Sequence, residues 1–391
     1  MFVSRRRKDK EEGIALVLVL VFLAFFSILV SDFLYRARLN TYLTFNQTEQ
    51  VRARFLAEAG LSSAEGLLLH SAPFTRNYRG NFQNQFINLF ECTCYSVQGL
   101  FGFQKQERES EQSLGGECGE WKLVLDWPIE EDTIHLEISD ETARLNLNAL
   151  VKKSMGGEGA EEYTDYKHIV SELIKFRLNE LGFDVSDEEI DGLIELIIDW
   201  LDWGEVSGRF DHDFNEYYQD GDRIYSNKNG PMDSVSELRM IPGVNEEIYY
   251  ALKDFFTVYP LSTDGEDFLE KVNINLAPLA VVYALIRGAS YRGGIAEIDE
   301  EQALEYAREI IESGIDENGF LKDRQIPNEL PYELKIKLRS SFILDANPPQ
   351  TRYYHILSSA LTSSGVNYTI EAVMMIVPGS SKPRYLYWRE G

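Results

Sequence analysis

The sequence predicts an α+β fold, with a long N-terminal helix packed on an antiparallel sheet and a large all-α domain inserted before the last strands. Three observations support this class. An apolar N-terminal run passes without a break into amphipathic spacing, alternating residues predict strands early and late in the remaining chain, and helical spacing dominates between them. The chain has 391 residues, of which 44% are hydrophobic, so a helix and two domains are expected.

The stretch Gly13–Val30 is apolar, lacks proline and follows the basic cluster Arg5-Arg6-Arg7-Lys8. At about 1.5 Å per residue, a helix of this length just spans a bilayer core. The basic cluster predicts a cytoplasmic N-terminus, so the chain after Ser31 should lie on the far side. A cleaved secretory signal would need small residues after the run, whereas Asp32-Phe33-Leu34-Tyr35 follows. A plain single-pass anchor stays open.

Apolar residues continue beyond the run among polar ones, with no glycine before Gly60 and no proline before Pro73. This spacing predicts that one helix leaves the membrane and continues as an amphipathic spine over residues 14–72. The segment after the spine is rich in polar residues and contains the three cysteines, Cys92, Cys94 and Cys118. In an exported domain they predict one disulfide, from Cys118 to Cys92 or Cys94, with a metal site as the alternative.

Alternation of apolar and polar residues predicts several short strands. In the first part of the body these are residues 121–127, 133–140 and 143–148, with Asp140-Glu141-Thr142 as the turn between the last two. At the C-terminus they are residues 353–360, 368–377 and 384–388, with a hairpin turn at Ser363-Ser364-Gly365. One sheet formed from both groups, covered by the spine helix, is the expected body.

Helical spacing extends from Tyr163 to Ser341, after the linker Met155–Gly159. Ser186 and Glu189 form a capping box, and apolar residues at helical spacing follow it.

The helix that begins at this capping box ends in carboxylates, with Asp199 and Asp202 on one face, where the helix dipole repels anions. Several carboxylates on a glycine-containing loop suit calcium better than magnesium or a transition metal. A solvated acidic loop is the alternative. The candidate ligands are Asp199, Asp202, Glu205, Asp211, Asp213 and Glu216.

Two segments have the pattern of helix-hairpin-helix units. Ser236–Val244 contains a Pro-Gly hairpin, and Val272–Pro278 begins a second unit whose hairpin is expected at Ile286–Ala289. Such hairpins bind DNA when backbone N–H groups and nearby cationic side chains meet a phosphate. The net charge is −26, acidic residues surround both units, and no basic stripe is present. We therefore expect packing units and no nucleic-acid partner; a membrane-anchored DNA receptor is the alternative function.

No catalytic constellation stands out. The five histidines are scattered, and the sequence contains no G-x-S-x-G, no H-E-x-x-H and no phosphate-binding loop. We therefore expect a protein that is not an enzyme.

The leader and several internal motifs resemble the K pseudopilin of type II secretion (general secretion pathway protein K, GspK). A charged leader followed by Gly13 and an apolar run is similar to the type IV prepilin leader, which a prepilin peptidase cuts after the glycine. Most pilins and pseudopilins carry Glu as the fifth mature residue, whereas Leu18 stands there, as in the K subunit. The internal motifs are Asp199-Trp200-Leu201-Asp202, Ser236-Glu237-Leu238-Arg239 and Val272-Asn273-Ile274-Asn275.

The resemblance implies a pilin-like fold, cleavage between Gly13 and Ile14, methylation of Ile14, and calcium in the acidic loop. The implied function is that of a minor pseudopilin that initiates the periplasmic pseudopilus and forms its tip, anchored in the bacterial inner membrane. Its implied partners are the I and J minor pseudopilins, the prepilin peptidase and the inner-membrane assembly platform. A type IV pilus minor pilin or tip protein is the alternative. The expected domains are 1–13 (leader), 14–72 (spine helix), 73–152 (body, first part), 153–345 (inserted helical domain) and 346–391 (C-terminal strands).

Overall fold

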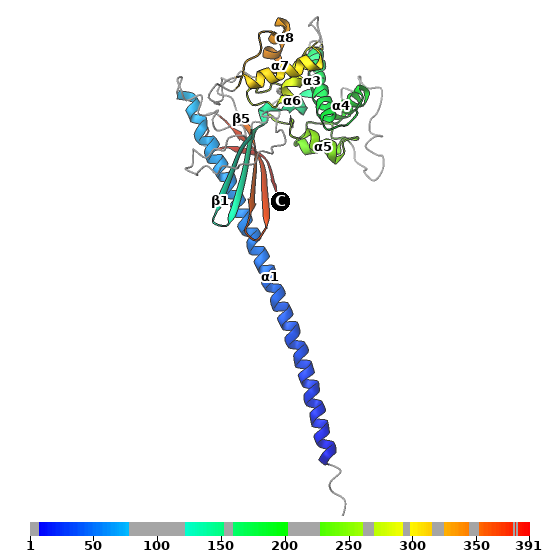
Figure 1. Ribbon diagram of the computed structural model, residues 1–391, viewed down its shortest axis with the longest axis vertical. Helices are drawn as coiled ribbons and strands as arrows, with labels where there is room; N and C mark the ends of the chain where they lie inside the picture. The colour runs from blue at the N-terminus through cyan, green and yellow to red at the C-terminus, as the bar shows by residue number, and fades with distance from the viewer. Residues whose placement is uncertain are drawn as a thin grey trace, which may run out of the picture.

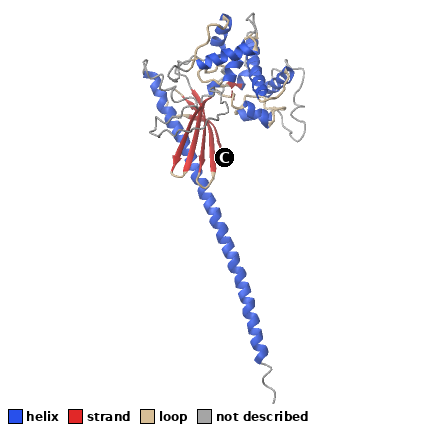
Figure 2. Ribbon diagram, viewed as in Figure 1, coloured by secondary structure: helices blue, strands red, loops and turns tan. Residues whose placement is uncertain are grey.

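The computed structural model describes residues 8–77, 122–151, 159–201, 227–260, 270–291, 298–314, 324–343, 352–377, 380 and 382–391. A long helix, a five-stranded sheet and a group of shorter helices make up this part of the chain (Figure 1, Figure 2). The α-helices are α1 (Lys8–Asn77), α3 (Gly159–Glu180), α4 (Asp187–Leu201), α5 (Glu246–Leu252), α6 (Leu279–Ala289), α7 (Glu300–Glu312) and α8 (Tyr332–Lys337). The strands are β1 (Lys122–Ile129), β2 (Asp132–Asp140), β3 (Leu145–Asn146), β4 (Phe256–Thr257), β5 (Arg352–Leu361), β6 (Asn367–Ile376) and β7 (Arg384–Glu390). Short 3-10 helices are η2 (Glu141–Ala143), η3 (Leu147–Leu150) and η5 (Val235–Met240), and η6 (Leu338–Phe342) is a π-helix.

Helix α1 is a single element of 70 residues, which corresponds to a rod of about 105 Å. Its first half stands apart from the rest of the molecule, and the sheet packs along its second half (Figure 1). The remaining helices gather beyond the end of the sheet that is farther from the N-terminus (Figure 2). The predicted α+β class, with a long N-terminal helix on an antiparallel sheet, is confirmed.

The sheet has the strand order β1-β2-β5-β6-β7 and is antiparallel throughout. Strands β2 and β5 are neighbours although the helices lie between them in the chain, and Asp140 pairs with Tyr354 at their common end. The helical domain therefore leaves and re-enters the sheet between two adjacent strands. In β2 the buried residues Ile134, Leu136 and Ile138 alternate with less buried ones, as the sequence predicts.

The second half of α1 meets the sheet through small side chains at helical spacing. Ala53, Ala57 and Ala64 are completely buried, and Leu61 and Leu68 are nearly so. Because alanine keeps the helix axis close to the sheet, the larger inward-facing residues of the strands can fill the space on either side. The strand residues of this core are Leu125, Leu136, Ile138, Tyr354, Ile356, Ala360, Ile370, Ala372, Met374 and Ile376.

Gly60 marks the closest approach of the helix to the sheet. A Cβ atom at this position would lie 2.2 Å from Ser358 Oγ and 2.8 Å from Ile134 Cγ2. Ser358, which is fully buried, donates a hydrogen bond from its hydroxyl to the backbone oxygen of Ala57 at 2.9 Å. A turn of α1 and the centre of β5 are thus joined by a direct hydrogen bond that a side chain at Gly60 would disturb.

The strand predicted at 143–148 is wrong. These residues form the end of η2, the two-residue strand β3 and the start of η3, and β3 pairs in parallel with β4 instead of joining the main sheet. Asn146 is the reason, because its side chain accepts a hydrogen bond from the backbone N–H of Asn148 at 3.0 Å and turns the chain. Leu145 and Leu147 are both fully buried, so the alternation records burial in the helical domain and not a sheet face.

The same asparagine turn recurs later in the helical domain. Asn273 Oδ1 accepts from the backbone N–H of Asn275 at 3.2 Å, as Asn146 does from Asn148. Both turns begin beside a returning segment that runs parallel to them: β4 beside β3, and Ile343 beside Val272. The apolar-Asn-apolar-Asn pattern therefore opens two similar folding units.

The helix starts and turns of this domain follow the sequence in part. Helix α4 begins with the predicted capping box, in which Ser186 N donates to Glu189 Oε2 at 2.9 Å and Glu189 N donates to Ser186 Oγ at 3.3 Å. The first hairpin is also present, since η5 and α5 flank a turn in which Gly243 has a φ of +87°.

The second hairpin, predicted at Ile286–Ala289, is wrong, because α6 runs without a break through these residues. Gly288 lies inside this helix, where a Cβ atom would be 2.5 Å from Ile169 Cα of α3. The glycine therefore permits close packing of α3 against α6 and does not make a turn. The predicted domain boundaries at 152/153 and 345/346 fall outside the described residues and stay predictions.

Replacing Gly60 with Ala should lower the free energy of unfolding of the body by about 1–3 kcal/mol, because the methyl group has no room against Ser358 and Ile134. Gly66→Ala is the matched control on the same helix, since nothing lies within 4 Å of its Cβ position. That variant should be neutral or gain up to about 1 kcal/mol of helix propensity. Chemical unfolding of the detergent-solubilised chain measures both, and equal stabilities would contradict the packing described here.

Candidate functional site

The apolar part of α1 is exposed along its length. In the described part of the chain, one helix is long and apolar enough to cross a membrane, and none of its most apolar stretch of 18 residues is buried. Leu18 and Phe25, for example, are 52% and 57% exposed. So large an apolar surface needs a lipid or protein environment, and its length and position fit a single-pass membrane anchor. The predicted cleavage residues Gly13 and Ile14 both lie in α1.

Polar side chains at the two margins of α1 hold it to the sheet. On one side Arg52 Nε lies 2.7 Å from Asp132 Oδ2, and the Asp132 side chain is only 1% exposed. On the other side the hydroxyl of Tyr385 donates to Glu65 Oε2 at 3.1 Å. These charges of α1 are engaged with its own sheet, so they leave the opposite face of the helix to other contacts.

The face of α1 opposite the sheet carries an uncharged row that we name the outer strip. Its residues recur every three or four positions, and all are exposed: Phe33, Ala37, Thr41, Thr44, Thr48, Val51, Phe55, Ala59, Ser62 and Gly66. At 3.6 residues per turn this row lies about 180° around the helix from the buried alanines. Most of its side chains are small, and the largest beside the body are Phe55, 64% exposed, and Val51, 53% exposed. Such a surface suits the close packing of a second helix.

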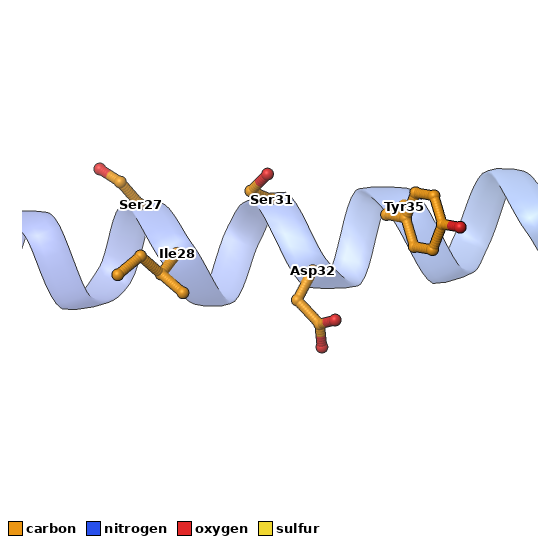
Figure 3. Close-up of a pocket in the computed structure, with 5 residues that line it drawn as sticks. All are labelled: Ser27, Ile28, Ser31, Asp32 and Tyr35. Atoms are coloured by element: carbon orange, nitrogen blue, oxygen red, sulfur yellow. The ribbon is translucent and has the colours of Figure 1, made fainter.

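A shallow depression lies lower on α1, at the end of the apolar segment. Ser27, Ile28, Ser31, Asp32 and Tyr35 line it, all from the same helix (Figure 3). Since a single helix supplies every lining residue, the depression encloses no ligand. It marks the change from apolar to polar side chains, where a tyrosine commonly lies at the membrane surface.

The two ends of the acidic loop meet at the C-terminus of α4. Asn227 Nδ2 donates to Asp199 Oδ2 at 3.2 Å and to the backbone oxygen of Asp199 at 3.3 Å. At the next residue of α4, the backbone oxygen of Trp200 accepts a hydrogen bond from the backbone N–H of Gly230 at 3.4 Å. Asp199 is thus held at the closed base of the loop, with an amide side chain beside its carboxylate. Carboxylate and amide oxygens are ligands that calcium accepts.

Asp199 is the one predicted ligand that the structure describes. The other predicted ligands and the three cysteines lie outside the described residues: Asp202, Glu205, Asp211, Asp213, Glu216, Cys92, Cys94 and Cys118. Among the residues with described positions, no group of three or more His, Cys, Asp or Glu side chains could hold a metal ion. The calcium site and the disulfide therefore stay predictions.

A buried polar junction joins the sheet to the helical domain. Asp140 Oδ1 accepts from the backbone N–H of Thr142 at 2.8 Å and from its hydroxyl at 2.6 Å, and Asn273 N donates to the Thr142 backbone oxygen at 2.7 Å. Complete burial raises the pKa of Asp140, and the hydrogen bonds from Thr142 and the charge of Arg352 only partly offset this effect. The junction orients the helical domain on the end of the sheet.

Sequence reasoning did not single out the outer strip or Asn227. The strip does leave a signal, which is the absence of charge at every third or fourth position over a long helix whose other faces carry charged residues. Asn227 leaves none, because its partner Asp199 is 28 residues away in the chain. Contacts of this kind become visible only when the loop ends are placed together.

Comparison with known proteins bears on this arrangement. A family model described as type II secretion system (T2SS), protein K, matches residues 143–261. Over these residues the chain is similar to protein K of type II secretion. The match begins just after Asp140 and Thr142 of the polar junction and extends through α3, α4, the acidic loop and the first hairpin. It confirms the resemblance that the internal motifs suggest.

The whole fold is also similar to a solved structure. A chain in the crystal structure of the GspK-GspI-GspJ complex from the type 2 secretion system of enterotoxigenic Escherichia coli matches with a TM-score of 0.54 and 17% identity. The match covers 89% of this chain and 99% of that chain, so the similarity in fold includes both the sheet and the helical domain. A search of curated proteins finds no match.

Proposed function

We propose that this chain is a minor pseudopilin of the type II secretion system that initiates the periplasmic pseudopilus and forms its tip. The apolar part of α1 anchors it in the inner membrane, with the N-terminus in the cytoplasm and the sheet and helical domain in the periplasm. The observation that carries the proposal is the uncharged outer strip of α1, on a chain whose residues 143–261 match protein K of this system. That match also favours type II secretion over a type IV pilus.

The outer strip supports lateral assembly with other pilin-like subunits. Small residues let a second helix approach closely, and Val51 and Phe55 are large enough to insert between the side chains of that helix. The charges at the margins of α1 are paired with its own sheet, so they do not oppose an apolar neighbour. The matched crystal structure contains GspI and GspJ beside GspK, and we take the I and J minor pseudopilins as the partners of this strip.

The helical domain supports the position at the tip. It has the larger of the two apolar cores and lies beyond the end of the sheet that is farther from the N-terminus (Figure 1). We take this to be the space that a subunit stacked above would need. Leu18 is consistent with the same position. A first subunit has no earlier neighbour whose N-terminal amine needs a carboxylate, so an apolar residue is acceptable there. Its role is structural and not enzymatic.

The acidic loop supports calcium as a structural ion. Asp199 is fixed at the loop base by Asn227, and the five other candidate ligands follow within the loop sequence. Bound calcium would neutralise part of a net charge of −26 and would hold the loop to the end of α4. It would therefore stabilise the helical domain without taking part in chemistry.

Phe55→Glu should weaken association with the I and J minor pseudopilins at least tenfold, because a charge would enter an apolar helix contact. Co-purification of the three detergent-solubilised subunits measures the effect. Tyr332→Glu is the control, since Tyr332 is 73% exposed and belongs to α8, one of the helices beyond the end of the sheet (Figure 1). Equal recovery of partners with both variants would contradict an assembly role for the outer strip.

Gly13→Ala should leave the leader attached, because the peptidase that cuts prepilin leaders acts after this glycine. Mass spectrometry of the membrane-extracted protein should find methylated Ile14 at the start of the unmodified chain and an intact leader on the variant. Leu18→Glu, five residues further on, should be cut normally. A Gly13→Ala protein trimmed to Ile14 at the usual rate would overturn the assignment.

Calcium should raise the melting temperature of the full chain, and Asp199→Asn should remove most of that gain. A ligand at a hundred times its dissociation constant stabilises the state that binds it by about 2.7 kcal/mol, and the lost carboxylate should cost tenfold or more in affinity. Asp191→Asn is the control, since Asp191 is exposed on the same helix. Identical calcium shifts in the two variants, or none in the parent chain, would speak against the site.

A further inference from the structure

The sheet face that points away from α1 carries a histidine held between two carboxylates. His135 of β2 lies directly across from Asp126 of the edge strand β1. Its Nδ1 is 2.7 Å from Asp126 Oδ1, and its Nε2 is 3.0 Å from Glu137 Oε1. The His135 side chain is 38% exposed, so protons reach it freely.

This geometry requires the charged form of the ring. A neutral imidazole has one N–H group and one lone pair, so it would point the lone pair at one of the two carboxylates. Only the imidazolium can donate to Asp126 and Glu137 together. From the strand on the other side, β5, the residue opposite His135 is the uncharged Ser359.

Other charged groups lie further along the same face. His355 Nε2 is 3.0 Å from Glu371 Oε1, and Arg389 Nη2 is 2.7 Å from Glu371 Oε2. Glu371 is therefore already neutralised by Arg389, and it does not compete for His135. Partial burial lowers the pKa of His135, but the hydrogen bonds and charges of Asp126 and Glu137 outweigh it and raise the pKa above its ordinary value.

We propose that His135 is a proton-controlled latch, which ties the edge strand β1 to β2 while the ring is charged and loosens it when the ring becomes neutral. Among the described strands β1 pairs with β2 alone, and Pro128 contributes no backbone N–H to that pairing. The Asp126 contact is thus an additional cross-strand bond at this edge of the described sheet. Glu137, on the same strand as His135, favours the charged ring and makes the tie stronger.

The direction of the pH dependence follows from linkage. Because the pKa of His135 is higher in the folded chain than in the unfolded chain, its contribution is complete at pH values below the unfolded pKa. The contribution is lost as the pH rises through the folded pKa. β1 should therefore be most firmly held in mildly acidic medium and should open more often in alkaline medium.

Hydrogen exchange of the full chain in detergent micelles tests the latch. Exchange is expressed as protection relative to the intrinsic rate at each pH, between about pH 5.5 and about pH 9. The protection of the β1 amides should fall roughly three- to tenfold across this range, since a charge-assisted hydrogen bond is replaced by a neutral one. Amides in β5 and β6, which have two neighbouring strands, should keep constant protection.

Two variants distinguish the latch from general loosening of the sheet. In His135→Gln the protection of β1 should no longer depend on pH, whereas His355→Gln should keep the dependence of the parent chain. NMR of the ring nitrogens in the unmodified chain gives an independent readout, with both nitrogens of His135 protonated at mildly acidic pH. A ring that titrates at or below the ordinary histidine value would overturn the proposal, and so would the same pH dependence of β1 in His135→Gln.

Discussion

The seating of α1 on the sheet is the constraint on which the rest of the molecule depends. Ala53, Ala57, Gly60 and Ala64 bring the helix axis so near the strands that a serine of β5 bonds directly to the backbone of the helix. Larger side chains at these positions would hold the helix away and leave the inward-facing residues of the strands without partners. Because the seat uses one face of the helix, the opposite face remains free and uncharged. The contact with the sheet and the outer strip therefore lie on opposite faces of one helix.

The helical domain depends on the sheet in a different way. It is inserted between two adjacent strands, so both of its connections leave from one end of the sheet, at Asp140 and at Arg352. The polar junction around Asp140 and Thr142 then bonds to Asn273, which opens the second folding unit of the domain. Burial of these polar groups is tolerable because each bond satisfies a donor and an acceptor together. Hydrogen bonds thus help to orient the helical domain on the sheet, together with apolar contacts of Tyr353 and Val373 with the core of that domain.

Much of this fold could be predicted from sequence, because long periodic segments determine their own structure. The spine, the strands β1, β2, β5, β6 and β7, and the capping box of α4 all follow local patterns. The two errors have different causes. At Leu145–Asn148 the Asn146 side chain turns the chain and β3 pairs with β4. At Gly288 the deciding contact is with Ile169, which is distant in the chain. The alternating residues Leu145 and Leu147 are buried among helices, and Gly288 makes room for α3. For the acidic loop, the sequence predicts ligand chemistry, and the structure adds the contact of Asn227 with Asp199.

Helix α1 runs as one element from the apolar segment to the end of the sheet, and its sequence has no proline before Pro73, near its C-terminal end. A continuous α-helix resists compression along its axis, and the seat on the sheet stiffens its second half further. A displacement of the helix along its axis near Ile14 therefore also displaces the helical domain. A rotation of the helix about its axis turns the helical domain in the same way. The chain thus has a helix of about 105 Å, and the sheet is packed along the second half of that helix. If the membrane end of α1 moves along the axis by the length of one subunit step, the helical domain moves by the same length.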